Sequence, residues 1–303
     1  MKKIFHRNTL IVVFVLALML LSVPTNMSVS AQATTTNFTA TYRGQGSNSS
    51  TCNTTFNIVG QEPSASGTYP VFVYTVGTNE NFTSSLATAA VNGMAQRGFV
   101  AATIQYANGQ FGTCSQISGK AECIYDANSA TSAITTLCNR PKADCNKGIV
   151  VAGFSQGSVI ADLAKNFDAR VEAAWGMGDG VSYTFLFNLR SCLANGNRAL
   201  ASDRLRAING QRDIFVGSNT SGVRSQLQTL TGFNCGSSAL SCLQNNGSGW
   251  YIVQDGQTQD GRADHCYMFV GGCTGNLDPN FVNGNAPFCL NPNLDWLKNF
   301  ARP

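Results

Sequence analysis

Hydrophobic residues follow two spacings along the chain, and their alternation predicts an α/β protein. Short runs rich in β-branched and aromatic residues are typical of strands, and they occur at residues 38–42, 54–59, 71–76, 99–106, 148–152, 171–175, 204–209 and 250–254. Apolar residues three or four positions apart predict helices at residues 82–97, 127–138, 158–167 and 293–300. This alternation indicates a mostly parallel sheet with helices on both faces.

Three segments interrupt this rhythm. Residues 107–122 contain glycines and are predicted to form a loop. Residues 181–203 and the polar residues 214–248 are interpreted as insertions. The length suits one domain with a sizeable core, so we predict a single α/β domain over residues 34–303.

The first 33 residues have the pattern of a signal peptide. Lys2 and Lys3 precede an apolar stretch at residues 10–23, and small residues at positions 31–33 offer a cleavage site. The alternative is a membrane anchor, but this stretch is shorter than the ~20 residues that span a bilayer. We therefore predict an exported, extracellular protein without a stable membrane anchor, whose mature chain begins near Thr34.

The charge balance excludes some classes of partner. The chain has 20 basic and 16 acidic residues, and Lys2, Lys3 and Arg7 leave with the predicted signal peptide. The remaining charges nearly cancel, which argues against nucleic acid or an anionic membrane as the main partner.

All eleven cysteines lie beyond the predicted signal peptide. In an exported protein they predict a disulfide framework, and zinc is not expected because no C-x-x-C pairs occur. We expect neither a metal nor a cofactor. Close spacing predicts the pairs Cys114–Cys123, Cys235–Cys242 and Cys266–Cys273. The odd number leaves at least one thiol free or paired between chains.

The sequence Gly153-Phe154-Ser155-Gln156-Gly157 lies between a predicted strand and a predicted helix. In this context the G-x-S-x-G motif places the serine hydroxyl clear of a sharp turn, with helix amides close by. The alternative is an ordinary strand-to-helix loop of common turn residues. We predict that Ser155 is a nucleophile.

A serine nucleophile needs a general base, and a carboxylate to orient that base. His6 leaves with the predicted signal peptide, so His265, after the last predicted strand, is the candidate base. Asp213 follows a strand and gives the chain order Ser, Asp, His of α/β-hydrolases. Asp179 is the alternative acid. Each residue also has a structural alternative: a turn role for the aspartates and a loop-stabilising role for His265.

The oxyanion of acyl transfer needs preorganised hydrogen-bond donors. The amide of Gln156 is one candidate, and Thr78, after the strand at residues 71–76, is the second. The alternative for residues 77–79 is a simple turn. Three aspartates near His265 are interpreted as solvated carboxylates rather than a weak calcium site: Asp255, Asp260 and Asp264.

Two motifs resemble those of the cutinases. Gly77-Thr78-Asn79-Glu80 resembles their G-[ST]-x-E loop, and residues 153–157 resemble their G-Y-S-Q-G. The resemblance implies an α/β-hydrolase fold and a secreted serine esterase acting on cutin, short acyl esters or related polyesters. It also implies a disulfide between Cys145 and Cys52, in competition with pairing to Cys138. The interval between Asp213 and His265 is longer than in cutinases.

Together these features predict a monomeric carboxylic ester hydrolase that forms an acyl-enzyme on Ser155. Its partner would be an ester substrate, either a small molecule or a polymer. Tyr183, Phe185 and Phe187 are candidates for an acyl-binding face or a lid, with buried packing as the alternative. The rival functions are a polyester depolymerase, acyltransferase or peptidase using the same triad, or a non-catalytic secreted binding module.

Overall fold

The computed structural model describes residues 33–44, 52–183 and 187–302. Residues 1–32 of the predicted signal peptide and Phe185 therefore lie outside the described residues. Within the described residues no helix is both long and apolar enough to cross a bilayer.

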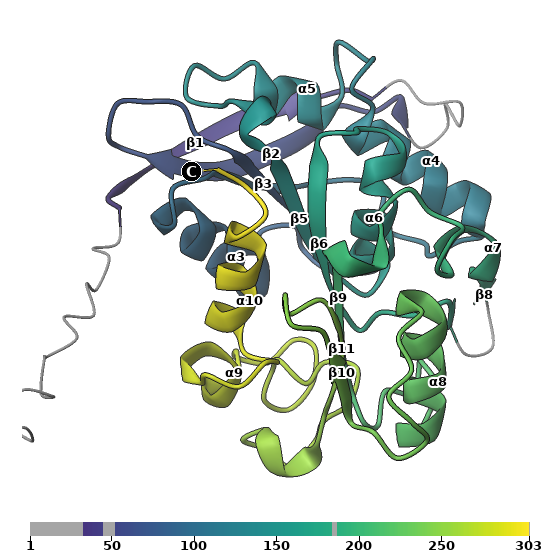
Figure 1. Ribbon diagram of the computed structural model, residues 1–303. Coiled ribbons are helices and arrows are strands. Elements are labelled where there is room, and N and C mark those ends of the chain that lie inside the picture. The colour runs from purple at the N-terminus through teal and green to yellow at the C-terminus, as the bar shows by residue number, and fades with distance from the viewer. Residues whose placement is uncertain (1–32, 45–51, 184–186, 303) are drawn as a thin grey trace, which may run out of the picture. The chain divides into compact units, whose positions relative to one another are not determined.

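Among the described residues, nine strands form one mixed sheet in the order β1-β2-β4-β3-β5-β6-β9-β11-β10 (Figure 1). The six strands from β4 to β11 pair in parallel, and antiparallel pairs flank them at both edges. These strands are β1 Thr35–Tyr42, β2 Phe56–Pro63, β3 Val71–Thr75, β4 Val100–Ile104, β5 Ile149–Phe154, β6 Val171–Met177, β9 Leu205–Gly210, β10 Ser241–Leu243 and β11 Gly249–Val253. The predicted α/β class is confirmed.

Helices cover both faces of this sheet. On one face α3 (Ser85–Gln96) packs against α10 (Leu290–Lys298), and on the other α4 (Cys114–Tyr125) packs against α6 (Gln156–Leu163) (Figure 1). Because both faces are covered, every residue of the central strands β3 and β5 is buried. The shorter elements are α5 Ala133–Cys138, α7 Arg190–Leu193, α9 Pro279–Asn283, β7 Ser182–Tyr183, β8 Phe187–Asn188, η1 Cys145–Lys147, η2 Ala164–Asn166, η3 Ser202–Arg204 and η4 Asp255–Gln257.

The prediction of a loop at residues 107–122 is wrong in its second half, because α4 begins at Cys114. The helix buries Ile117, Ala121 and Ile124, which lie on one face.

This helix also excludes the predicted Cys114–Cys123 pair. Cys123 lies nine positions after Cys114, which along a helix is a rise of about 13 Å to the opposite side, too far for a disulfide. The structure pairs Cys114 with Cys192, and Cys52 with Cys123.

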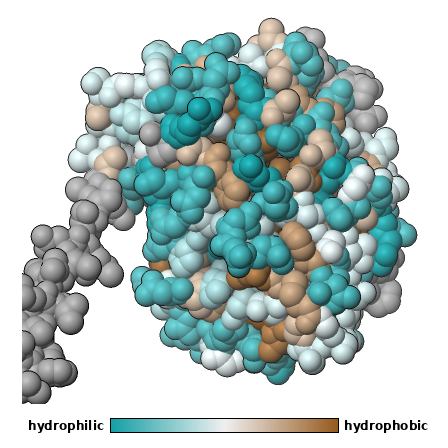
Figure 2. All heavy atoms as spheres, viewed as in Figure 1, coloured by the Kyte–Doolittle hydropathy of each residue, from teal (hydrophilic) through white to brown (hydrophobic). Residues whose placement is uncertain are grey.

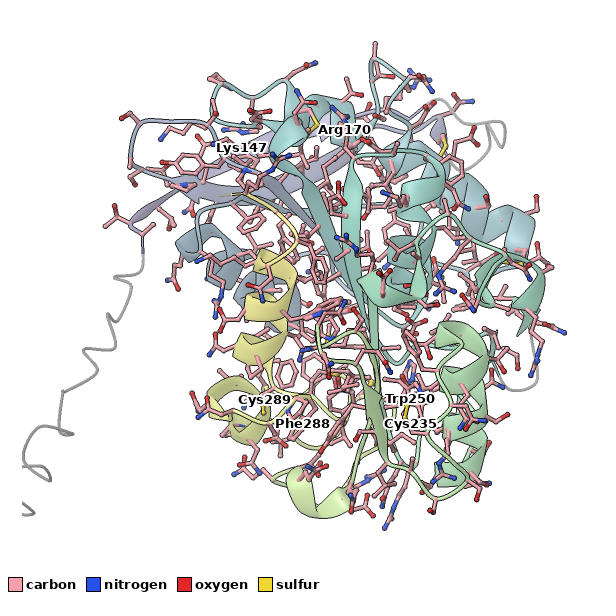
Figure 3. The ribbon with its side chains drawn as sticks, in the orientation of Figure 1. Lys147, Arg170, Cys235, Trp250, Phe288 and Cys289 are labelled. Carbon is pink, nitrogen blue, oxygen red and sulfur yellow. A yellow bond between two sulfur atoms is a disulfide. The ribbon has the colours of Figure 1, made fainter. Side chains whose placement is uncertain are left out.

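Cys145 is bonded to Cys138, so the Cys52–Cys145 pair implied by the resemblance is wrong. The predicted pairs Cys235–Cys242 and Cys266–Cys273 are confirmed. The odd cysteine is Cys289, which is buried beside Phe288 near the start of α10 (Figure 3).

The two expected insertions contain regular structure. Residues 214–248 include α8 (Thr220–Thr231), which packs against β9 and β11, and the edge strand β10. Asn219 caps α8 by accepting a hydrogen bond from the Gly222 amide, and Gly232 ends it in the left-handed conformation at φ 76°. Residues 181–203 include the short pair β7–β8 and α7.

The surface is mixed in character. Hydrophilic and hydrophobic residues alternate over the face shown in Figure 2. Among the described residues the large hydrophobic side chains that are exposed are Ile214 and Phe215, at 61% and 47%. Both directly follow Asp213, one of the candidate site residues.

Candidate active site

The candidate residues gather at the carboxyl-terminal ends of the parallel strands. Lys147 and Arg170 precede β5 and β6 and mark the opposite, amino-terminal ends (Figure 3). Parallel neighbouring strands bring the residues at their carboxyl ends close together. The residues that follow β3, β5, β6, β9 and β11 are Thr78, Ser155, Asp179, Asp213 and His265.

Ser155 occupies a strained turn between β5 and α6. Its backbone has φ 54° and ψ −118°, and its amide donates to the Met177 carbonyl at 2.8 Å. A positive φ in a residue other than glycine costs ~1–3 kcal/mol and persists only where the surrounding structure imposes it. The half-buried serine side chain lines a cavity.

The two glycines of the motif allow α6 to approach the sheet closely. A Cβ atom at Gly157 would overlap the Thr75 carbonyl, and one at Gly153 would overlap the Gly157 carbonyl. The Thr75 hydroxyl donates to the Gly157 carbonyl at 2.8 Å. The turn around Ser155 therefore requires glycine at both positions.

His265 is hydrogen-bonded to Asp213. The distance between His265 Nδ1 and Asp213 Oδ2 is 2.8 Å, and both side chains are buried. The bond occupies Nδ1, so Nε2 is the ring nitrogen available to a reacting group. His265 lines the same cavity as Ser155.

The Asp213 carboxylate is fixed by four hydrogen bonds. Its Oδ1 accepts from the amides of Phe215 and Val216, both at 2.9 Å. Its Oδ2 accepts from Asn209 Nδ2 at 3.3 Å and faces His265. Each of these four partners can donate a hydrogen to the acceptor oxygens of the carboxylate.

Glycines and aromatic rings hold the imidazole in place. A Cβ atom at Gly178 would press on the ring of His265, and one at Gly210 would overlap the backbone of the loop that carries it. The rings of Phe154 and Phe215 lie 5.0 and 4.8 Å from that of His265, measured between centroids. Close packing thus limits the ring orientations open to His265.

Asp179 does not contact His265 among the described contacts. Asn209 lies between the two aspartates: its Oδ1 accepts from the Asp179 amide, and its Nδ2 donates to the Asp179 carbonyl and to Asp213. The Asp179 side chain is buried, and its Oδ1 accepts from the Gly180 amide at 2.8 Å. The structure therefore brings Asp213, rather than Asp179, to the imidazole.

A second buried carboxyl group interacts with Asp179. Asp162 on α6 is fully buried, and burial, with the charge of Asp179, raises its pKa well above the usual value. Burial likewise raises the pKa of Asp179 to about 7, although the Gly180 amide and the charge of Arg198 lower it. In the native state this pair therefore retains a proton near neutral pH.

This proton predicts a pH dependence of stability. The unfolded carboxyls lose their protons near pH 4, whereas burial raises the pKa of Asp162 well above its usual value and that of Asp179 to about 7. The contribution of the protonated pair to the free energy of unfolding therefore falls as pH rises from about 4 to 7. We expect the free energy of unfolding of Asp162→Asn to fall less than that of the wild type between pH 4.5 and 7.5, in urea denaturation. Parallel pH profiles for the two proteins would contradict this account.

Thr78 and Gln156 are the two candidate oxyanion donors, and Gln156 directly follows Ser155 in the chain. Gln156 is the first residue of α6, so its amide has no acceptor within the helix. Thr78 lines the cavity, and its Oγ1 accepts from Gln156 Nε2 at 2.9 Å. Thr78 thus lines the cavity, and Gln156, the residue after Ser155, contacts its hydroxyl.

The turn that carries Thr78 is tied down on both sides. Glu80 accepts from the Gly77 amide at 2.6 Å and from the Ser84 hydroxyl at 2.7 Å. The pKa of Glu80 is raised, because the effect of burial exceeds the lowering by these two hydrogen bonds. Asn108 Nδ2 donates to the carbonyls of Gly77 and Glu80, each at 2.8 Å. The Thr78 backbone is therefore held before any ligand binds.

The cavity has a volume of about 690 Å³, and its wall combines six aromatic residues with polar residues from the segment 78–85. The aromatic residues that line it are Phe111, Phe154, Tyr183, Phe187, Phe215 and Phe269. Tyr183 and Phe187 were candidates from the sequence; Tyr183 is mostly buried and donates to the Gly178 carbonyl at 2.8 Å. Phe111 contacts both, with centroids at 4.4 and 5.5 Å. Sequence reasoning missed Phe111, because a loop residue carries no periodic signal.

The three aspartates around His265 have protein partners. Asp255 accepts from the Ala263 amide and pairs with Arg212. Asp260 accepts from the amides of Arg262 and Gly271, and these bonds lower its pKa. A third aspartate, Asp264, caps the Cys266 amide. These half-buried carboxylates are hydrogen-bonded to their own loops, whereas the sequence predicted solvated carboxylates.

Comparisons with known proteins add little to this geometry. No family model matches the chain, and no curated protein matches it. Among solved structures, a hypothetical protein from Pseudomonas aeruginosa is similar with a TM-score of 0.36 and 16% identity. The match covers 55% of this chain and 47% of that protein, so it spans about half of each.

Proposed function

We propose that this protein is a secreted serine hydrolase of α/β-hydrolase fold that cleaves carboxylic esters. The observation that carries the proposal is the 2.8 Å bond between Asp213 and His265, in a cavity that His265 shares with the strained Ser155. A serine, an imidazole and a buried carboxylate in chain order Ser, Asp, His are the groups that acyl transfer requires.

Each residue has a defined role in the proposed mechanism. Ser155 attacks the ester carbonyl while His265 Nε2 takes its proton, and Asp213 stabilises the resulting imidazolium. The Gln156 amide and the Thr78 hydroxyl bind the oxyanion. His265 then gives the proton to the leaving alcohol oxygen. In the second half of the reaction His265 takes a proton from water, which attacks the acyl-enzyme, and the proton passes to Ser155 as the acid leaves.

The substrate class follows from the cavity. Its aromatic wall favours an apolar acyl or aryl group beside the scissile ester, whether the ester is small or part of a polymer. The five disulfides and the predicted signal peptide support an extracellular site of action.

Stopped-flow hydrolysis of p-nitrophenyl acetate tests this proposal. We expect a burst of p-nitrophenol stoichiometric with the protein, followed by slower turnover, because the acyl-enzyme forms faster than water releases it. Added methanol should yield methyl acetate if acyl transfer to alcohols competes with hydrolysis. Absence of both burst and turnover in the folded protein would favour the non-catalytic binding module.

A further inference from the structure

A buried lysine lies behind the candidate oxyanion hole. Lys120, on α4, is only 5% exposed. Its Nζ donates to Gln156 Oε1 at 3.0 Å, to the Phe111 carbonyl at 2.9 Å and to the Gln110 carbonyl. An ammonium group has three donor hydrogens and no acceptor, so these three oxygens match it fully.

This contact fixes the orientation of the Gln156 amide. A side-chain amide has an acceptor end and a donor end, which look alike in shape. Because the Lys120 ammonium only donates, it holds the Gln156 oxygen towards itself. Gln156 Nε2 is then directed to Thr78 Oγ1 at 2.9 Å and to the Gln110 carbonyl at 2.8 Å.

The orientation of Gln156 in turn decides what the Thr78 hydroxyl does. A hydroxyl has one hydrogen to donate and two lone pairs. Since Gln156 Nε2 donates to it, Thr78 Oγ1 is the acceptor in that bond and its hydrogen remains free for the cavity. A reversed amide would present Oε1 to Thr78 and would take this hydrogen away from the cavity.

We propose that Lys120 is a positioning residue of the oxyanion hole, which acts through the Gln156 amide to direct the Thr78 hydroxyl hydrogen towards the reacting ester. This inference rests on the proposed esterase function. Burial lowers the pKa of Lys120 to about 8, so the fully matched ammonium is still the main form at neutral pH. The same lysine also binds the carbonyl of Phe111, whose ring forms part of the cavity wall.

A double-mutant cycle tests the proposal with kcat and KM for p-nitrophenyl butyrate. Thr78→Val removes the hydroxyl, and we expect kcat to fall about 100-fold, as for loss of one oxyanion donor. Lys120→Met should lower kcat by about 10- to 100-fold with little change in KM, because the donor acts in the transition state. In the Thr78→Val background the same lysine substitution should cost less than about threefold, because the hydroxyl that it directs is already absent.

Lys142→Met is the matched control. Lys142 also donates to two backbone carbonyls, those of Pro63 and Ser64, but it does not line the cavity. Its kcat should equal that of the wild type. If Lys120→Met does not fold, as judged by circular dichroism, Lys120→Gln replaces it in the cycle. The amide introduced by Lys120→Gln carries an acceptor as well as donors, so it no longer imposes one orientation on Gln156.

Two results would overturn the proposal: an unchanged kcat in the folded Lys120 variant, or effects of Lys120 and Thr78 that multiply in the double variant. Multiplying effects would indicate a structural role independent of the hydroxyl. Both results differ from failure of the esterase proposal itself, in which the wild type would lack turnover or Ser155→Ala would retain it.

Discussion

Ser155→Ala is expected to lower kcat for p-nitrophenyl butyrate by at least about 10⁴-fold while the protein stays folded. The substitution removes the attacking oxygen, so no acyl-enzyme can form. The turn itself should persist, because glycines at positions 153 and 157, not the serine side chain, permit the close approach of α6 to β3. Any remaining hydrolysis would come from water attacking an ester bound at the oxyanion donors.

The control for this change is Ser225→Ala, at an exposed serine on α8. Its kcat should match that of the wild type. Circular dichroism and thermal unfolding of both variants would separate a loss of chemistry from a loss of fold. Wild-type turnover in folded Ser155→Ala would exclude Ser155 as the nucleophile.

The second large effect is expected for Asp213→Asn, which should lower kcat by about 10⁴-fold. The amides of Phe215 and Val216 would still bind the Asn oxygen in place of Oδ1. The new NH₂ group would therefore face His265 Nδ1, and two donors cannot bond. His265 would adopt the tautomer with its hydrogen on Nε2, which cannot accept the serine proton.

Asp179→Asn is the matched comparison, since it makes the same chemical change at the rival carboxyl. Asp179 does not contact His265 in the described structure, so kcat should fall by less than about tenfold. Both variants are measured side by side at pH 7.5. A larger loss in Asp179→Asn would reverse the assignment of the acid.

Local sequence patterns predicted the elements that surround the serine. The apolar run at 148–152 and the helical spacing after Ser155 correspond to β5 and α6. These segments were predictable because their hydrophobic period depends only on burial against the sheet. The place of His265 beside Asp213, by contrast, depends on how the loop after β11 packs against Gly210.

Two features were missed for a physical reason. The helix α4 has apolar residues at helical spacing, but its two cysteines, Cys114 and Cys123, favoured a local disulfide that a helix forbids. Lys120 gave no signal, because a lysine on a helix is ordinarily solvated. Its burial arises only when α4 packs against α6, which is a tertiary contact.

The central claim is that Ser155 is activated by the imidazole of His265, and covalent labelling tests it most directly. The folded protein is treated with a fluorophosphonate probe at pH 7.5, and the labelled peptide is identified by mass spectrometry. The account predicts one rapidly modified residue, Ser155, with labelling greatly slowed in His265→Ala. No labelling of the wild type, or rapid labelling of Ser155 without the imidazole, would contradict it.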